Sequence, residues 1–265
     1  MIPAYNEQDR LPVMLDAALD VLSSSSSDEK KKKYGVSTIE WVVVDDGSVD
    51  GTCNVVRRYA KQQQQLPYDW TLVSLSPNCG KGGAVQQGML QARGQRRLMV
   101  DADGATNFEE LWNLLDKQHQ QQQQQKDVVV FGSRAHLQES SKAQRSLLRT
   151  LLMHAFHVFV ALLCGSSGVR DTQCGFKLFT AGSARRLFGN LHLQQWAFDT
   201  ELVVLCGILR LPIAEVAVEW REIEGSKLDS SKIQLALVSI QMLRDMVCVR
   251  LCYTLGIWKV QPQPQ

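Results

Sequence analysis

The 265-residue sequence is bounded first by what it lacks. It opens with no signal peptide and no run of about 20 apolar residues, so its start predicts neither a secretory leader nor a membrane-spanning helix. Its seven cysteines are an odd number and form no Cys-x-x-Cys pair. Cys248 and Cys252 lie one helical turn apart with no histidine nearby, so a zinc site, which needs about four ligands, is not indicated. Scattered thiols are typical of a reducing compartment.

Two signatures of nucleic-acid and nucleotide proteins are also missing. The formal net charge of +2 does not decide for or against nucleic acid, but no basic run is interleaved with aromatic residues, so we expect no nucleic-acid partner. The run Lys30–Lys33 lies in a polar stretch over 23–33, which we expect to be a solvated loop. The GxxxxGK(S/T) motif of a P-loop is absent.

What the sequence does contain is an alternation of strand and helix patterns. With 45% apolar residues it can form one large core, and its length favours one domain. The predicted helices cover 10–22, 52–64, 82–93 and 107–118, and the predicted strands cover 39–44, 70–75, 97–101 and 127–131. This alternation predicts an α/β fold with a mostly parallel, doubly wound sheet flanked by helices. Glutamine tracts at 62–65 and 120–125 are expected to be loop expansions.

Membrane contact is indicated at the start of the chain and in two later segments. Ile2 and Pro3 resemble the end of a strand, so we expect that the sequence is truncated and that a membrane anchor is among the missing residues. After residue 140, the long apolar segments 145–164 and 233–258 each carry arginines, which disfavour a spanning helix. A helix lying in the headgroup layer and an ordinary buried helix remain open for each, and the presence of two favours the first.

Two pairs of carboxylates follow predicted strands. Asp45 and Asp46 end the apolar strand 39–44, and Asp101 and Asp103 end the strand 97–101. Ligands of doubly wound sheets bind beyond the carboxyl ends of the strands. Two carboxylates on one side of a strand repel each other unless a cation lies between them, and Mg²⁺ or Mn²⁺ bound also to phosphates meets that need. For Asp45 and Asp46 a simple turn-capping role remains open.

A glycine-rich segment over 78–88, NCGKGGAVQQG, opens the predicted helix 82–93. Its glycines allow close approach of the backbone to a ligand, and Lys81 could contact a phosphate. The alternative is an ordinary loop at the start of a helix.

These motifs together resemble a known family. In chain order PAYNE, VVVDDGSVDGT, NCGKGGA and DADGAT are similar to the family 2 glycosyltransferases, which have a GT-A fold. Later segments strengthen the resemblance to members that act on dolichyl phosphate: GSRAHL, RDTQCGFKLFT, WAFDTEL and EIEGSK. The resemblance spans residues 2–259 and is interrupted mainly by the Ser/Lys and Gln tracts.

The resemblance implies a reaction and a location. It implies transfer of glucose from UDP-glucose to dolichyl phosphate, with inversion of the anomeric carbon and with Mg²⁺ or Mn²⁺ as the metal. It implies an enzyme of the endoplasmic reticulum membrane that faces the cytosol and supplies a glucose donor for N-glycan assembly. The catalytic domain would span 1–230, including the interface helix 145–164, and 231–265 would form a second interface helix and a tail.

The resemblance also implies roles for residues on the donor side. The nucleotide would be held by Pro3, Tyr5 and Glu7, with the Tyr5 ring on the uracil. Asp45 and Asp46 would contact the uridine portion. Asp101 and Asp103 would approach the ribose and diphosphate and bind the metal, with Asp103 as the main metal ligand.

On the acceptor side, cations are needed to hold one phosphate beside another. The candidates are Arg134, Arg145 and Lys227, each of which could instead be a surface or salt-bridge residue. Lys177 is a further candidate phosphate contact. Asp199 and Glu201 are assigned to sugar orientation or to a structural bond.

Other activities remain possible. The nearest is the same chemistry with another sugar, such as GDP-mannose to dolichyl phosphate, or a bacterial-type polyprenyl-phosphate glucosyltransferase. A non-catalytic module that binds sugar nucleotides is disfavoured by the complete set of carboxylates and by Arg134. A nucleotidyltransferase is disfavoured because its glycine-rich loop would be expected near the N-terminus.

Overall fold

The computed structural model describes residues 1–63, 68–140, 169–223 and 232–261. In the described residues, the strands form two sheets. The first has the order β1-β2-β3, with all pairs parallel, and consists of β1 (Ile2–Ala4), β2 (Ile39–Asp45) and β3 (Tyr68–Ser74). The second has the order β4-β6-β5-β7 and consists of β4 (Arg96–Val100), β6 (Phe176–Thr180), β5 (Val129–Ser133) and β7 (Ile213–Ala217).

The two sheets continue into each other where β1 lies beside β4. The Met1 amine donates to the Leu98 carbonyl at 2.7 Å, and the Val100 N–H donates to the Met1 carbonyl at 3.0 Å. Met1 thus bonds to Leu98 and to Val100, the residues on either side of Met99, and this is the hydrogen-bond pattern of parallel strands. The strands therefore follow each other in space as β3-β2-β1-β4-β6-β5-β7, and β6 alone runs antiparallel to its neighbours.

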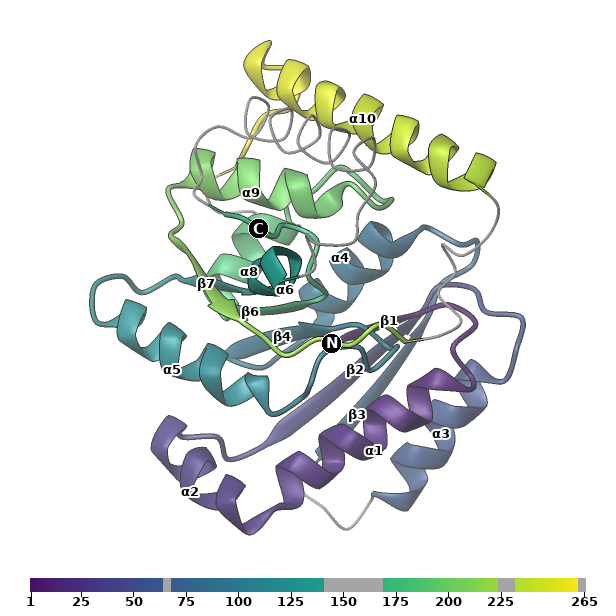
Figure 1. Cartoon of the computed structure of the whole chain (residues 1–265), viewed down its shortest axis with the longest axis vertical. Helices are drawn as coiled ribbons and strands as arrows, with labels where there is room; N and C mark the ends of the chain where they lie inside the picture. The colour runs from purple at the N-terminus through teal and green to yellow at the C-terminus, as the bar shows by residue number, and fades with distance from the viewer. Residues whose placement is uncertain (64–67, 141–168, 224–231, 262–265) are drawn as a thin grey trace.

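Helices cover both faces of this sheet (Figure 1). One face carries α1 (Arg10–Ser23), α2 (Ser25–Tyr34), α3 (Thr52–Gln62) and α5 (Glu110–Gln122). The other face carries α4 (Lys81–Gln91), α8 (Ala181–Phe188) and α9 (Phe198–Leu209), while the short α6 (Ala135–Ser140) follows β5. The predicted strands and helices up to residue 131 are confirmed to within a few residues at each end.

The continuous apolar run of β2 is explained by these two layers. Trp41 and Val43 pack into the core under α1, α3 and α5, whereas Val42 and Val44 pack into the core under α4, α8 and α9. Successive strand side chains point to opposite faces, so a strand covered on both sides must be apolar throughout. The carboxylates that follow therefore lie at the point where the buried strand reaches the edge of the core.

The polar stretch 23–33 is not a loop, and this expectation was wrong. Residues Ser25–Tyr34 form α2, which ends at Gly35 in the left-handed conformation with φ of 63°. Asp28 lies in its first turn and three lysines lie in its last turn, which suits the charges at the two ends of a helix. Tyr34 is buried and stacks on Trp112 of α5. The aromatic contact thus holds an otherwise polar helix on the protein, and the charges at its two ends stabilise the helix itself.

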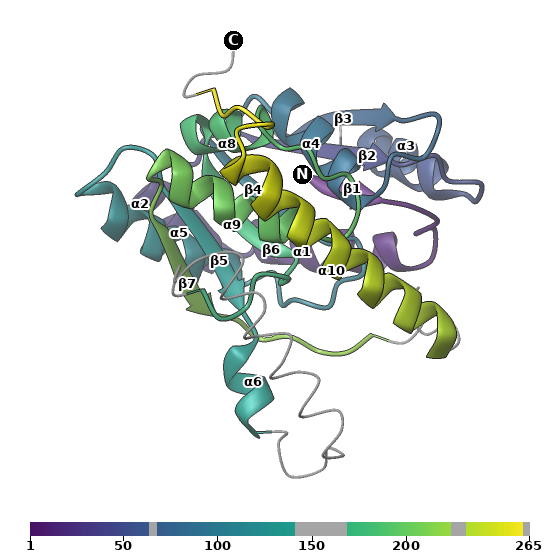
Figure 2. The same cartoon turned by 90° about the horizontal axis from the view of Figure 1, so that it is seen from above.

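The C-terminal apolar segment is confirmed as a helix, α10 (Lys232–Thr254), and the segment 145–164 lies outside the described residues. Figures 1 and 2 show α10 lying across the outside of α9. Its end is fastened by Tyr253, whose hydroxyl donates to the buried carboxylate of Glu201 at 2.6 Å, and by Trp258, whose ring stacks on His192. Within the described part of the chain, no helix combines the length and apolarity needed to cross a membrane.

Candidate active site

The candidate site lies at the carboxyl ends of β1, β2 and β4, where three loops meet. The loop after β1 is tied to the loop after β2 through Asn6, whose N–H donates to Ser48 Oγ at 2.8 Å and whose Oδ1 accepts from the Val49 N–H at 2.9 Å. The Glu7 N–H donates to Thr52 Oγ1 at 2.7 Å. Asn6 has a φ of 52°, a left-handed conformation that asparagine tolerates better than most residues. These bonds make one rigid rim from two segments that are distant in sequence.

Asp46 fastens the glycine-rich segment to this rim. Its two carboxylate oxygens accept hydrogen bonds from the backbone N–H groups of Cys79, at 2.7 Å, and Gly80, at 2.8 Å. Burial raises the pKa of Asp46, against the lowering effect of these two bonds. Gly80 has a φ of 85°, and an added Cβ would lie 2.5 Å from Gln195 Nε2, so both the backbone conformation and the space require glycine. Contact of Asp46 with uridine stays a prediction, because the structure gives both oxygens another partner.

Asp101 and Asp103 follow β4, and a lysine from α4 meets them. The ammonium of Lys81 lies 2.8 Å from each carboxylate oxygen of Asp101. Asp103 Oδ1 accepts from the Ala105 N–H at 2.9 Å. Burial first, and then the charge of Asp101, raise the pKa of Asp103. Lys81, which was expected to contact a phosphate, thus lies directly on Asp101, and its contact with a phosphate stays a prediction.

The position of Asp101 is made possible by Gly175, directly before β6. A Cβ added at Gly175 would lie 1.9 Å from Asp101 Oδ2 and 2.2 Å from Cγ, far inside contact distance. The Asp101 N–H also donates to the Gly175 carbonyl at 3.1 Å. The φ of Gly175 is not in the left-handed region, so the backbone conformation does not require glycine. Glycine is needed because a side chain would collide with Asp101. The carboxylate therefore rests against bare backbone on one side and against Lys81 on another.

The donor set fits a divalent cation that is bound together with phosphates. Asp101 Oδ1 is a buried oxygen that accepts no geometrically acceptable hydrogen bond, although the Lys81 ammonium is close to it. Among the described residues, no three His, Cys, Asp or Glu side chains are grouped as ligands, so protein ligands alone do not complete a metal shell. Mg²⁺ commonly takes one or two carboxylates and completes its shell with substrate phosphates and water. Asp101 and Asp103 match that pattern.

The residues expected to hold the nucleotide have mixed surroundings. Pro3 is buried within β1, and Tyr5 is 40% exposed at the rim. The carboxylate of Glu7 accepts two hydrogen bonds from the Arg10 guanidinium, at 2.6 and 2.7 Å. Burial would lower the pKa of Arg10, but Glu7 and the more distant Asp103 and Asp101 raise it. Arg10 is a cation close to the carboxylates that sequence reasoning missed, and only its place after the PAYNE motif could have indicated it.

Arg134 lies at the end of β5, where its guanidinium is held by an acidic partner. Its Nε and Nη2 donate to Asp171 at 2.8 and 3.0 Å, and the guanidinium lies 5.4 Å from the centre of the Trp220 ring. Burial would raise the pKa of Asp171, but the hydrogen bonds and charge of Arg134 hold it below its usual range. The fork of Arg134 is thus engaged with Asp171, and its role toward a phosphate stays a prediction. Arg145 and Lys227 lie outside the described residues.

A second buried ion pair lies behind Lys81. The ammonium of Lys177, which is fully buried, donates to Asp199 Oδ1 at 2.8 Å and to the Cys174 carbonyl. Burial would lower the pKa of Lys81, but the charges of Asp101, Asp199 and Asp103 raise it. Glu201 is fully buried and accepts from the N–H groups of His192 and Leu193. In the structure Asp199, Glu201 and Lys177 therefore have structural bonds, and no contact of Lys177 with a phosphate is indicated.

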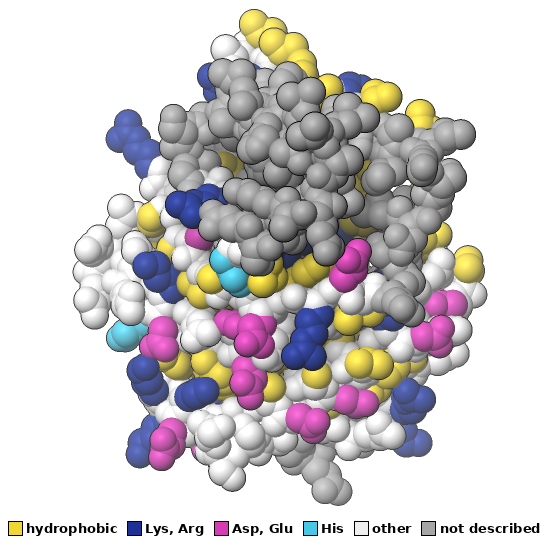
Figure 3. Space-filling view, viewed as in Figure 1, with side chains coloured by type: hydrophobic (Ala, Val, Ile, Leu, Met, Phe, Trp, Pro, Cys, Tyr) yellow, Lys and Arg dark blue, Asp and Glu magenta, His cyan; other side chains and the backbone are white. Residues whose placement is uncertain are grey.

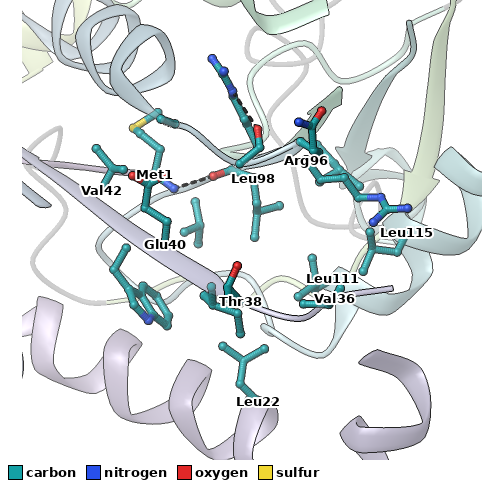
Figure 4. Close-up of a pocket in the computed structure, with 18 of the residues that line it drawn as sticks. Met1, Leu22, Val36, Thr38, Glu40, Val42, Arg96, Leu98, Leu111 and Leu115 are labelled. Carbon is teal, nitrogen blue, oxygen red and sulfur yellow. Dashed lines mark hydrogen bonds between the residues drawn. The ribbon is translucent and has the colours of Figure 1, made fainter. Parts of the chain in front are cut away.

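A cavity among the described residues lies away from these groups. It has a volume of about 540 Å³ and lies between the beginnings of β2 and β4, the opposite ends from those that carry the carboxylates (Figure 4). Met1, Glu40 and Leu98 are among its lining residues. The candidate site is therefore defined by its charged groups and not by cavity size.

Sequence comparisons agree with the motifs. A family model described as Glycosyl transferase family 2 matches residues 1–188. The chain is 47% identical over 262 residues to the dolichyl-phosphate beta-glucosyltransferase of Dictyostelium discoideum, covering 98% of this chain and 76% of the relative. It is 44% identical over 262 residues to the dolichyl-phosphate beta-glucosyltransferase of Homo sapiens, covering 98% of this chain and 77% of the relative.

Solved structures share the architecture at low identity. Glucosyl-3-phosphoglycerate synthase from Mycobacterium tuberculosis, in complex with uridine diphosphate, matches with a TM-score of 0.61 and 16% identity, covering 94% of this chain and 78% of that one. A mannosyltransferase from Pyrobaculum calidifontis, in complex with GDP-Man and Mn²⁺, matches with a TM-score of 0.60 and 18% identity, covering 93% of this chain and 62% of that one. These likenesses concern the fold alone, and they confirm the predicted GT-A architecture.

Proposed function

Because the chain belongs to glycosyl transferase family 2, we propose that it transfers glucose from UDP-glucose to dolichyl phosphate and releases UDP. The observation that carries this proposal is the 44–47% identity, over 98% of the chain, to two dolichyl-phosphate beta-glucosyltransferases. The charged groups at the ends of β2 and β4 support it, because a diphosphate needs cations and metal ligands within reach of one another. The proposed setting is the endoplasmic reticulum membrane, with the catalytic domain facing the cytosol.

On the donor side, the rim of the site would receive the nucleotide and the two carboxylates after β4 would hold Mg²⁺ or Mn²⁺. Such a metal, when bound, neutralises charge on the diphosphate as it leaves. Tyr5 is exposed enough for its ring to lie on a base. Asp46 keeps the glycine-rich segment against the rim, and this segment leads into α4. Lys81, at that start, supplies a positive charge beside Asp101.

On the acceptor side, the protein must bind the phosphate of the acceptor, and it does not need a general base to remove a proton from it. A phosphate oxygen of the acceptor already carries negative charge, so it can attack the anomeric carbon without a general base, and attack opposite the diphosphate inverts that carbon. The ion pair of Asp199 with Lys177 agrees with a reaction that needs no general base, since a buried, paired carboxylate is poorly placed to accept a proton. Arg134 remains the candidate among the described cations, and Arg145 and Lys227 are further candidates.

We further propose that α10 contacts the membrane that contains the acceptor. Its outer surface carries exposed apolar side chains, and Figure 3 shows yellow side chains along α10 at the top of the molecule with dark blue ones beside them. The exposed apolar residues of α10 are Leu237, Ile240, Leu243 and Leu251, and Leu255 and Ile257 follow directly after the helix. Exposed cations of the same region are Arg244, Arg250 and Lys259. Apolar side chains beside cations are typical of helices that lie in the headgroup layer.

The test of the proposed function compares donors. Purified protein is incubated with dolichyl phosphate in detergent, Mg²⁺ or Mn²⁺, and radiolabelled UDP-glucose or GDP-mannose in parallel, with Asp103→Ala as the control. We expect lipid-extractable label from UDP-glucose only, and none from the Asp103→Ala variant. Label from GDP-mannose alone would overturn the proposed donor and keep the family. Equal label with and without the Asp103 carboxylate would overturn the proposed metal site.

A further inference from the structure

The ammonium of Lys81 occupies the position beside Asp101 where a cation is needed. Its Nζ lies 2.8 Å from both carboxylate oxygens, and both side chains are largely buried, with 20% of Lys81 and 28% of Asp101 exposed. Asp103 adds a second negative charge close by, with one oxygen on the Ala105 N–H. Without a metal, Lys81 is therefore the direct counter-charge of the pair.

The carboxylate of Asp101 is confined on one side. It lies directly on the backbone of Gly175, so closely that an added Cβ there would lie 1.9 Å from Oδ2. Lys81 is the mobile partner, since its ammonium is carried on a flexible four-carbon chain at the first residue of α4. If the contact is to break, the lysine moves and the carboxylate stays.

A metal ion and an ammonium compete for the same oxygens. Two cations held on one carboxylate would repel each other strongly in a site this poorly exposed to water. Lys81 would need another anion in order to leave Asp101. Asp199 is not available as that anion, because it is already paired with Lys177 at 2.8 Å. A diphosphate that arrives with the metal supplies the missing negative charge.

We propose that Lys81 is a stand-in cation that keeps the metal out until the nucleotide arrives. Lys81 neutralises Asp101 in the free protein and moves to the diphosphate when metal and nucleotide bind together. This inference rests on the proposed function, because it requires a nucleoside diphosphate and a divalent metal at this site. Its consequence is that metal binding depends strongly on the nucleotide, and by linkage nucleotide binding depends equally on the metal.

The test measures Mn²⁺ binding directly, from the electron paramagnetic resonance signal of free Mn²⁺, with and without UDP. We expect UDP to tighten Mn²⁺ binding to the unmodified protein by about tenfold or more. In Lys81→Met, which keeps an unbranched side chain one atom shorter and removes the charge, we expect Mn²⁺ alone to bind about tenfold tighter than to the unmodified protein, and UDP to add little. Lys61→Met removes an exposed lysine of α3 in the same way and should leave both affinities unchanged.

Opposite results would separate the two proposals. If the unmodified protein binds Mn²⁺ tightly with UDP but Lys81→Met gains no affinity for Mn²⁺ alone, the stand-in role is overturned and the proposed function stands. If the unmodified protein binds no Mn²⁺ even with UDP, the metal-dependent function falls and the inference falls with it. Circular dichroism and thermal melting check that the variants fold, and Lys81→Gln serves the same test if Lys81→Met melts early.

Discussion

Gly175→Ala is expected to inactivate the enzyme while leaving it folded. The new Cβ would lie 1.9 Å from Asp101 Oδ2, whereas ordinary contact begins at 3.4 Å, so the carboxylate or the backbone must retreat by about 1.5 Å. Misplacing a group at the reacting centre by about 1 Å can cost on the order of 100-fold in rate, so we expect at least that loss in kcat. Overpacking of this kind costs roughly 1–3 kcal/mol of stability, which a protein of this size can tolerate.

Two glycine variants make the comparison specific. Gly182→Ala produces a similar collision, 2.0 Å from Asp127 Oδ1, but at a carboxylate away from the site, so it should lose stability and keep most of its activity. Gly207→Ala lies in α9 with no atom within 4 Å of the added Cβ, and it should gain about 0.5–1 kcal/mol from better helix propensity. Activity is measured as transfer of glucose label to dolichyl phosphate, and stability by thermal melting. Gly175→Ala activity within threefold of the unmodified protein, or equal losses in Gly175→Ala and Gly182→Ala, would refute the reasoning.

Three further predictions concern charge, tethering and the membrane. The folded-state pKa of Asp171 is below its usual value, so its pair with Arg134 stabilises the protein fully above about pH 3.9 and is lost as the pH falls through the lower folded pKa. Asp171→Asn should therefore show a smaller loss of melting temperature between pH 5 and pH 2.5, as thermal scans would reveal; parallel losses would contradict this. Tyr253→Phe removes a donor from the buried carboxylate of Glu201 and should cost about 1–3 kcal/mol in urea unfolding, and an unchanged midpoint would argue against the tether. Leu251→Asp places a charge on the outer face of α10 and should weaken cosedimentation with anionic phospholipid vesicles several-fold; undiminished binding would exclude this face.

The sequence was most informative where local pattern decides structure. The apolar run of β2 and the carboxylates after it predicted a strand buried on both faces and a site at its end, because both follow from residues adjacent in the chain. It failed for α2, whose helix depends on Tyr34 packing against Trp112, almost eighty residues away. It also did not predict β6, since Lys177 interrupts the apolar pattern and only the structure reveals its partner, Asp199.

The sequence predicted which residues belong to the site better than it predicted what those residues contact. The sequence singled out Lys81 as a phosphate contact and the carboxylates after β4 as metal ligands, and the structure pairs Lys81 with Asp101. It could not indicate that Gly175 presses on Asp101, or that Asp171 engages Arg134, because these pairs come from strands and loops joined only by the folded sheet. The resemblance ranked Arg134 as a phosphate contact, but sequence alone does not say whether a guanidinium already has a partner.

The most direct measurement is the chemical identity of the lipid product formed from UDP-glucose and unlabelled dolichyl phosphate. Product purified after complete conversion is examined by mass spectrometry and by proton and phosphorus nuclear magnetic resonance. The account predicts a single dolichyl glucosyl phosphate with the β configuration, as attack opposite the leaving diphosphate requires. Free glucose with no lipid product, or a glucosyl lipid with the α configuration, would contradict it.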